Sequence, residues 1–137
     1  MTDAAAAEEL WFRRGRGHEN TYGVRVGDGR YRLTATALNS PGRVRFGAIA
    51  ETVVEADGRR WISSIVTRSP YRSAMRIVSG DAIRSPRFEE LKTRIIGVGG
   101  MWEQLLSGIL IIHVPPESGL DPRAEIEALM AGVAFDQ

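Results

Sequence analysis

The stretch GAIAETVVEADGRRWISSIVTRSPYRSAMRIVS, residues 47–79, decides the fold of this 137-residue chain. Its Asp57-Gly58 pair lies between two runs that are rich in β-branched residues, which is the pattern of a β-hairpin. A two-residue type I′ turn needs positive φ at both central positions, and an Asp-Gly pair accepts such values. We therefore predict two long strands joined by a tight turn, with a third strand at residues 71–78.

The turn also predicts which side chains share a face of this hairpin. Counting outward from the turn sets these opposing pairs: Val54 with Trp61, and Ala50 with Ile65. These four apolar side chains then lie on one face, which we predict to be buried. Far from the turn the strands are apolar on both faces, so we expect other strands and a helix to cover both faces there. The tip of the hairpin should project into water.

A second hairpin is predicted at residues 22–37, turning at Asp28-Gly29. The same counting places Val26 opposite Tyr31 on an apolar face. On the other face it places Arg25 directly opposite Arg32. Like charges in opposed positions destabilise a sheet, so these side chains either spread into water or contact an anion.

These arginines define the candidate binding surface for an anion or a partner. Arg30 lies beside the opposed pair, and residues of the next strands extend the surface. The predicted set is Arg25, Arg30, Arg32, Arg68, Arg72 and Arg76. The simpler interpretation is that these arginines are solvated surface residues, paired with carboxylates from the C-terminal half.

The net charge of +1 hides a strong asymmetry along the chain. Residues 10–87 hold fifteen arginines and six acids, a net +9, whereas residues 88–137 hold three bases and eight acids, a net −5. Seventeen of the eighteen basic residues are arginine, which suits bidentate contacts with anions. The base composition of the genome explains the arginines equally well.

The C-terminal half predicts helices and one central strand. Ser85 and Pro86 suit the start of a helix that Gly97 ends, and Asp121 and Pro122 suit the start of another. Between the two helices lies a hairpin about Ser107-Gly108, whose second strand, ILIIHV, is apolar on both faces. A strand at residues 9–14 and the loop RGRGHEN open the chain.

This order of elements predicts the fold class and the domain organisation. We expect an α+β protein, with an antiparallel β meander of hairpins followed by a β-α-β-β-α half that resembles a ferredoxin-like plait. Residues 1–8 are predicted to be a disordered lead-in and residues 9–137 a single domain. An edge strand of the central hairpin leaves homodimerisation open.

Composition excludes several classes of protein. The chain has no cysteine, which excludes disulfides and thiolate sites. No run of eighteen apolar residues is present, so we expect no membrane span. The acidic start, MTDAAAAEE, lacks the features of a secretory signal, which predicts a cytoplasmic protein.

A search for catalytic or metal-binding groups finds little. The two histidines, His18 and His113, lie ninety-five positions apart, and for His113 we predict a satisfied structural role. The GVGG run follows a helix, so its amides do not form a phosphate cradle. We predict no catalytic residue, no metal site and no cofactor. Aromatic residues interleaved with arginines would suit base stacking, but Tyr31 and Trp61 fall on the predicted core faces.

The runs GDGRYRL (27–33), GRRWISSIVTRS (58–69), YRSAMRIVS (71–79) and HVPPESGLDPRAEIEALMAG (113–132) resemble the bacterial family called domain of unknown function 4265. The similarity extends over roughly residues 9–132. Tyr22 and the segment ALNSPG stand where members of the family tend to carry a tryptophan segment and an aromatic, proline-containing link. The family has no established activity, so the resemblance implies a bacterial setting and no catalytic residue.

Three hypotheses of function remain. The first is a small non-catalytic interaction protein, such as an immunity protein or an accessory regulator, that binds a protein partner through its basic and acidic surfaces. The second is a protein that binds nucleic acid or a phosphate ligand through arginines. The third is an enzyme whose residues converge only in space, with His113 and a carboxylate in a deep pocket.

Overall fold

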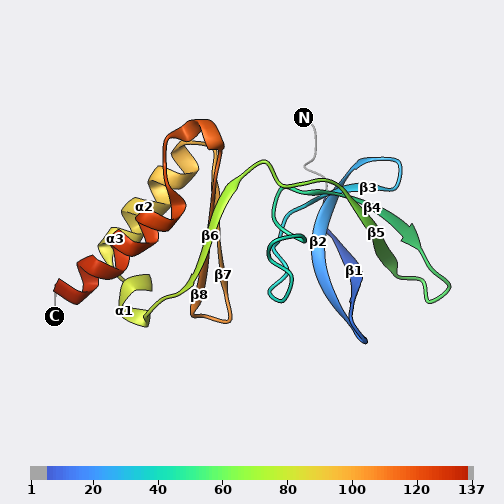
Figure 1. The fold of residues 1–137 in the computed structure, drawn as a ribbon, viewed down its shortest axis with the longest axis horizontal. Helices are drawn as coiled ribbons and strands as arrows, with labels where there is room; N and C mark the ends of the chain where they lie inside the picture. The colour runs from blue at the N-terminus through green and yellow to red at the C-terminus, as the bar shows by residue number, and fades with distance from the viewer. Residues whose placement is uncertain (1–5, 136–137) are drawn as a thin grey trace. The chain divides into compact units, whose positions relative to one another are not determined.

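The computed structural model describes residues 6–135, and the chain divides into two compact units, Met1–Ser69 and Pro70–Gln137 (Figure 1). Each unit has its own hydrophobic core, so the stretch 9–137, predicted as a single domain, contains two compact units. Of the expected disordered lead-in at residues 1–8, residues 1–5 lie outside the described residues. Glu8, in contrast, begins the first strand.

The first unit is a closed barrel of five strands in the order β1-β2-β3-β4-β5. Neighbours along the chain pair antiparallel, and a parallel bridge between Trp11 and Trp61 joins β1 to β5. The predicted meander is therefore present but closed on itself. The strands are β1 (Glu8–Arg14), β2 (Gly17–Gly27), β3 (Arg30–Leu33), β4 (Ile49–Val54) and β5 (Arg60–Thr67). The loop expected at RGRGHEN is shorter, because β2 begins at Gly17.

The Asp-Gly turns are not of the predicted type. Gly29 and Gly58 have φ of 67° and 80°, whereas neither aspartate has a positive φ. The Asp57 carboxylate accepts a 2.9 Å hydrogen bond from the backbone N–H of Arg59, and such a local bond favours an ordinary turn conformation at the aspartate. A hairpin with one left-handed glycine carries a longer loop or a bulge, which shifts the register by one residue.

This shift corrects the predicted pairing of β2 with β3. Arg25 lies opposite Tyr31, and Arg32 lies opposite Val24, with an irregularity between Arg25 and Gly27. The predicted opposition of Arg25 and Arg32 was therefore wrong. Val26, expected to share an apolar face with Tyr31, is 45% exposed.

In the β4–β5 hairpin two departures from the prediction cancel. Near the turn Trp61 lies opposite Val53 instead of Val54, but a bulge at Ser63 restores the predicted pair of Ala50 and Ile65. Because of the bulge, Ile62 and Ile65 both pack against the barrel core, while Trp61 points to the outer side of the strand. The prediction that Trp61 shares a face with Ala50 was wrong.

The barrel core is built from residues of β1, β3 and β4 and from the connection between β3 and β4. Tyr31 is 1% exposed, so its predicted burial is confirmed. The buried cluster consists of Leu10, Phe12, Tyr31, Leu33, Ala37, Val44, Ala48 and Ala50.

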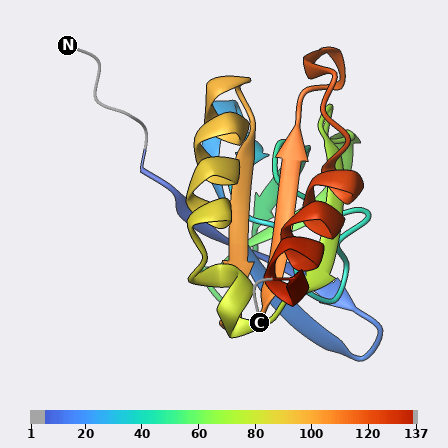
Figure 2. The same ribbon diagram turned by 90° about the vertical axis from the view of Figure 1, so that its left-hand side faces the viewer.

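The second unit is a three-stranded antiparallel sheet in the order β6-β8-β7. Its helices α2 and α3 lie side by side on one face of that sheet (Figure 2). The elements are β6 (Arg72–Ile77), α1 (Gly80–Ile83), α2 (Pro86–Gly97), β7 (Met101–Leu105), β8 (Ile109–Val114), the 3-10 helix η1 (Pro116–Ser118) and α3 (Pro122–Phe135). The short helix α1 was not predicted. The unit has the predicted β-α-β-β-α order with the three strands that this order contains. Because a closed five-stranded barrel precedes it, the protein is not a ferredoxin-like plait.

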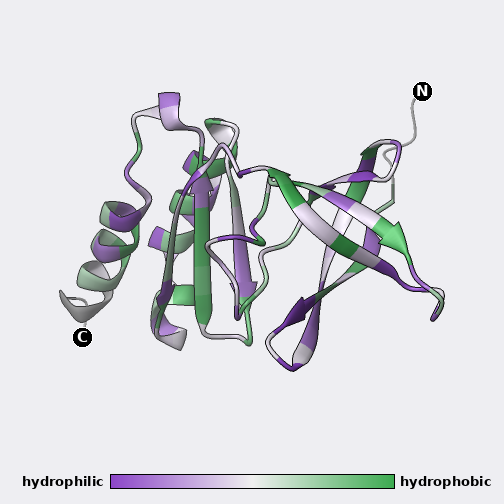
Figure 3. Ribbon diagram, turned by 45° about the vertical axis from the view of Figure 1, so that its right-hand side comes forward, coloured by the Kyte–Doolittle hydropathy of each residue, from purple (hydrophilic) through white to green (hydrophobic). Residues whose placement is uncertain are grey.

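Local signals predicted this unit well. The Ser85 hydroxyl accepts from the N–H of Phe88, and the Asp121 carboxylate accepts from the N–H of Arg123, so both predicted helix caps are confirmed. Strand β8 is central and almost continuously hydrophobic (Figure 3). The core lies between sheet and helices and is built from Val78, Ala82, Phe88, Leu91, Ile95, Leu110, Ile112, Val114, Ile126 and Leu129. Over the described residues, no helix combines the length and apolar character that crossing a membrane requires.

Candidate ligand-binding site

The predicted arginine surface is divided between the two units. In the first unit, Arg25 donates to the Gly27 carbonyl and to the Asp28 carboxylate, both at 3.3 Å. Arg30 lies opposite Glu51 across β3 and β4. Arg32 is exposed on β3. Without the predicted opposition of like charges, this face gives no reason to expect an anion there.

The two arginines of the second unit already have partners. Arg72 donates to the Leu120 carbonyl at 3.4 Å. Arg76 forms an ion pair with Glu127. Arg76 is therefore neutralised by a carboxylate, whereas Arg72 keeps its charge beside a carbonyl. Arg68, which follows β5 in the first unit, is exposed and takes part in no ion pair between described residues.

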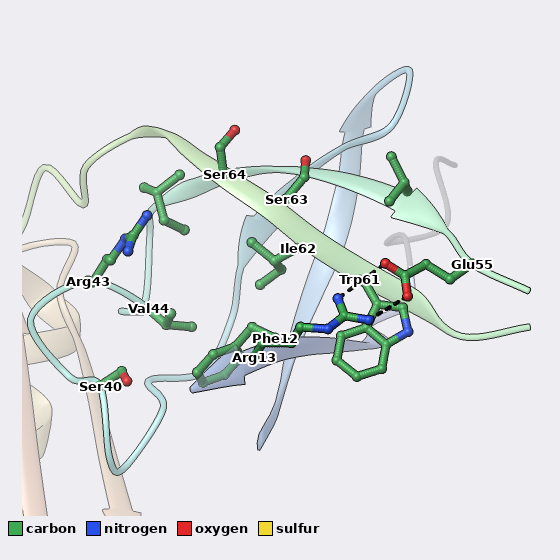
Figure 4. A pocket seen from close by; sticks show the side chains of 12 residues that line it. Phe12, Arg13, Ser40, Arg43, Val44, Glu55, Trp61, Ile62, Ser63 and Ser64 are labelled. Carbon is green, nitrogen blue, oxygen red and sulfur yellow. Dashed lines mark hydrogen bonds and ion pairs between the residues drawn. The ribbon is translucent and has the colours of Figure 1, made fainter. Parts of the chain in front are cut away.

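A cavity of about 440 Å³ opens in the barrel wall beside the junction of β1 and β5. A single bridge joins these strands at Trp11 and Trp61, so the wall is incomplete beyond it. We call this opening the seam cavity. Arg13 and Trp61 lie at one end and Arg43 at the other (Figure 4). Its apolar lining includes Phe12, Val44, Ile62 and Ile65.

A second hollow, of about 480 Å³, adjoins the seam cavity and shares Arg43 and Ile65 with it. Arg68 lines this second hollow. Like Arg68, Arg43 is exposed and forms no ion pair with another described residue. Two unneutralised guanidinium groups therefore flank an apolar opening, which suits an anion that carries an organic group.

The Trp61 end of the seam cavity is a cluster of stacked aromatic and basic side chains. The Arg13 guanidinium lies over the Trp61 ring, 4.0 Å from its centroid, and Arg59 lies over the Trp11 ring at 4.3 Å. The rings of Trp11 and His18 lie 6.3 Å and 6.0 Å from that of Trp61. The cluster covers the junction of β1 and β5 from outside.

Carboxylates hold this cluster in place. Glu55 binds Arg13 through two bonds of 2.6 and 3.2 Å, and this hydrogen-bonded carboxylate raises the pKa of the Arg13 guanidinium. Asp57 accepts from the Trp61 indole N–H at 3.2 Å. The backbone N–H of Arg59, followed by this indole bond, lowers the pKa of the Asp57 carboxyl below its ordinary value.

Sequence analysis missed Arg13 and Arg43 as site residues. Arg13 lies on β1 and contacts Glu55, which is forty-two positions away, across the barrel closure. No local sequence pattern predicts such a contact. Arg43 lies in the turn-rich connection between β3 and β4. The excess of arginine in this half of the sequence was the available signal, but it did not select residues.

His113 forms a hydrogen-bonded chain on the sheet of the second unit. The Ser73 hydroxyl lies 2.6 Å from its Nδ1, and a Glu103 carboxylate oxygen lies 2.6 Å from its Nε2. His113 is buried, and both ring nitrogens have partners, in agreement with the structural role predicted for it. Within residues 6–135, no group of three or more His, Asp and Glu side chains is arranged to hold a metal ion.

The fold defines an α+β protein with a barrel unit and a helix-covered sheet unit, and the seam cavity defines a candidate binding protein. No family model matches the chain, and no curated protein matches it. One solved structure that is similar is described as "Novel crystal structure of a hypothetical protein from Neisseria gonorrhoeae". It has a TM-score of 0.59 and 13% identity, over 98% of this chain and 91% of that chain. This likeness concerns the fold alone, and the resemblance to domain of unknown function 4265 stays a prediction.

Proposed function

We propose that the first unit binds a phosphate-bearing ligand at the seam cavity and the hollow that adjoins it, through Arg43 and Arg68. The observation that supports this proposal is the pair of exposed guanidinium groups without carboxylate partners beside an apolar opening. Arginine donates paired hydrogen bonds that match the oxygens of a phosphate. The shared chemistry is a phosphate ester, whether on a small molecule or in a nucleic-acid strand.

The distribution of charge supports this function over the binding of a partner by two oppositely charged surfaces. Residues 10–69 hold eleven arginines and five acids. In the second unit, half of the eight described acids form ion pairs with bases of the same unit: Arg76 with Glu127, Arg84 with Asp81, Lys92 with Glu89 and Arg94 with Glu125. These pairs reduce the negative charge that the second unit offers to a basic partner.

The test measures binding as a function of salt. A fluorescent single-stranded oligonucleotide and a small phosphate ester serve as the two ligands. We expect the affinity for the oligonucleotide to fall as salt rises, because arginines that neutralise phosphates release counterions from the strand. The double variant Arg43→Ala, Arg68→Ala should lower the slope of log K against log salt by about 2, one for each lost phosphate contact.

Arg84→Ala is the matched control, because Arg84 is an exposed arginine of the other unit with its own carboxylate partner. It should leave both the affinity and the salt slope unchanged. If the double variant behaves like this control, the seam cavity is not the binding site. Binding of the oligonucleotide alone would assign the ligand to nucleic acid.

A second candidate function is the binding of a protein partner, with homodimerisation as a special case. The observation that favours it is the exposure of Val53 and Val54 at the end of β4, at 47% and 57%. Because neighbours in a strand point to opposite sides, the end of β4 is apolar on both of its sides and could contact a partner there. A complex held by these valines would persist at high salt and would be lost in the variant Val54→Asp, whose position lies outside the lining of the seam cavity.

A further inference from the structure

Trp61 is an outward-facing side chain of the barrel that is nevertheless 5% exposed. Its ring is held from several directions. The indole N–H donates to Asp57, and the rings of Trp11 and His18 lie within 6.3 Å. The Arg13 guanidinium covers a face of the ring, 4.0 Å from the ring centroid.

That cover is removable. The Arg13 side chain is 59% exposed and is held by Glu55, whose side chain is 35% exposed. Ion pairs at this degree of exposure contribute little to stability and are screened by salt. Arg13, Glu55 and Trp61 all line the seam cavity, so a ligand bound there would meet all three (Figure 4).

A guanidinium stacked on tryptophan occupies the position that a planar aromatic ring would take. Nucleobases stack on tryptophan faces, and arginine makes a similar stacked contact. Once it leaves the ring, Arg13 would present its donors at the same opening as Arg43. The cavity, at about 440 Å³, falls within the size range of small-molecule sites.

We infer that the ligand of the seam cavity is a nucleotide. Its base stacks on the Trp61 ring in place of the Arg13 guanidinium, and its phosphate binds that guanidinium in place of the Glu55 carboxylate. This inference rests on the proposed function, because it adds the base to a phosphate that Arg43 also contacts. Glu55 therefore competes with the phosphate for the Arg13 guanidinium. The Arg13–Glu55 pair thereby closes the site when no ligand is bound.

The test compares two ligands that share a phosphate and differ in the base. A nucleoside 5′-monophosphate should bind at least about tenfold more tightly than ribose 5-phosphate, which is the order of one base stacked on an aromatic ring. Trp61→Leu should reduce the ratio of the two affinities to about one, and this ratio is the readout because Trp61 itself lines the cavity. Glu55→Gln should tighten the binding of both ligands, because the competing carboxylate is gone.

A second measurement guards against loss of folding in the Trp61 variant. In the unaltered protein, the nucleotide should shift the NMR signal of the Trp61 indole N–H strongly, and ribose 5-phosphate should shift it little. Equal affinity for the two ligands, an indole signal that does not respond to the base, or a Glu55→Gln variant that binds as the unaltered protein does would each overturn the inference.

The outcomes for the inference and for the proposed function are separable. Loss of ribose 5-phosphate binding in Arg43→Ala, Arg68→Ala, together with no effect of Trp61→Leu, would retain the phosphate site and reject the base. Unchanged nucleotide binding in the double arginine variant would reject the phosphate site. Binding of neither ligand at millimolar concentration would reject both. Tighter binding of a hexanucleotide than of the mononucleotide would identify a strand as the source of the base.

Discussion

The phenol of Tyr31 donates a 2.8 Å hydrogen bond to the carboxylate of Glu8. Tyr31 lies on β3 at 1% exposure, and Glu8 begins β1, so the bond ties the first residue of the barrel to its core. Burial, followed by the bond to Glu8, raises the pKa of Tyr31 above its ordinary value of 10.0. The neutral phenol is therefore the form that the folded barrel prefers.

This pKa shift predicts a loss of stability in alkali. Because the folded protein holds the Tyr31 proton more tightly than the unfolded chain, the contribution is complete below about pH 10 and is lost as the pH rises through the folded pKa. Tyr31→Phe should cost about 1 kcal/mol at neutral pH and should remove much of the alkaline decline. Urea unfolding between pH 7 and pH 11 measures both effects. An equally steep decline in the variant would contradict the assignment.

Gly100 and Gly97 provide a matched pair of glycine substitutions at the end of α2. A Cβ at Gly100 would overlap the His113 carbonyl oxygen and would lie 3.0 Å from both Cγ2 and the carbonyl oxygen of Ile95. A Cβ at Gly97 would meet nothing within 4 Å. Gly100→Ala should therefore destabilise the second unit by about 1 to 3 kcal/mol, the usual cost of overpacking. Gly97→Ala should be neutral or stabilising by up to about 1 kcal/mol. Chemical denaturation of the two variants gives the comparison, and equal stabilities would show that α2 and β8 approach less closely than described.

Asp57 should stabilise the β4–β5 turn only while it is ionised. Its carboxylate accepts from the Arg59 N–H and the Trp61 indole, and these bonds lower its pKa. Since the folded pKa lies below the unfolded value, the contribution is present above the ordinary pKa of 3.8 and is lost as the pH falls through the folded pKa. Asp57→Ala should destabilise the protein at neutral pH, and the difference from the unaltered protein should shrink in acid. Asp57→Asn, which keeps an acceptor oxygen, is the control and should lose less. A difference that is constant between pH 7 and pH 2 would argue against the role of the carboxylate.

The elements that were predicted correctly depend on short-range chemistry. Ser85 and Asp121 cap helices whose first residues are proline, and both signals lie within four positions of the bonds they form. Strand β8 was recognised as central because five of its six residues are apolar, a pattern that suits burial on both faces. Burial of Tyr31 followed from alternation within one short strand.

The register of the hairpins and the candidate site were beyond such reasoning. One extra residue in a strand moves every following side chain to the other face, and a bulge at Ser63 moved Trp61 from the core to the outside of the barrel. The pairing of β1 with β5 joins residues fifty positions apart, and only that closure brings Arg13 over Trp61.

For this protein, local composition was enough to identify the two long helices, the central strand and the approximate place of each turn, because capping, periodicity and turn propensity act over a few residues. Three-dimensional packing decided that the first strands close into a barrel, that two units form instead of one, and that Arg13, Arg43 and Trp61 meet at one cavity. Those outcomes depend on contacts between segments that are distant in the sequence. The free energies of such contacts cannot be inferred from a short stretch of residues.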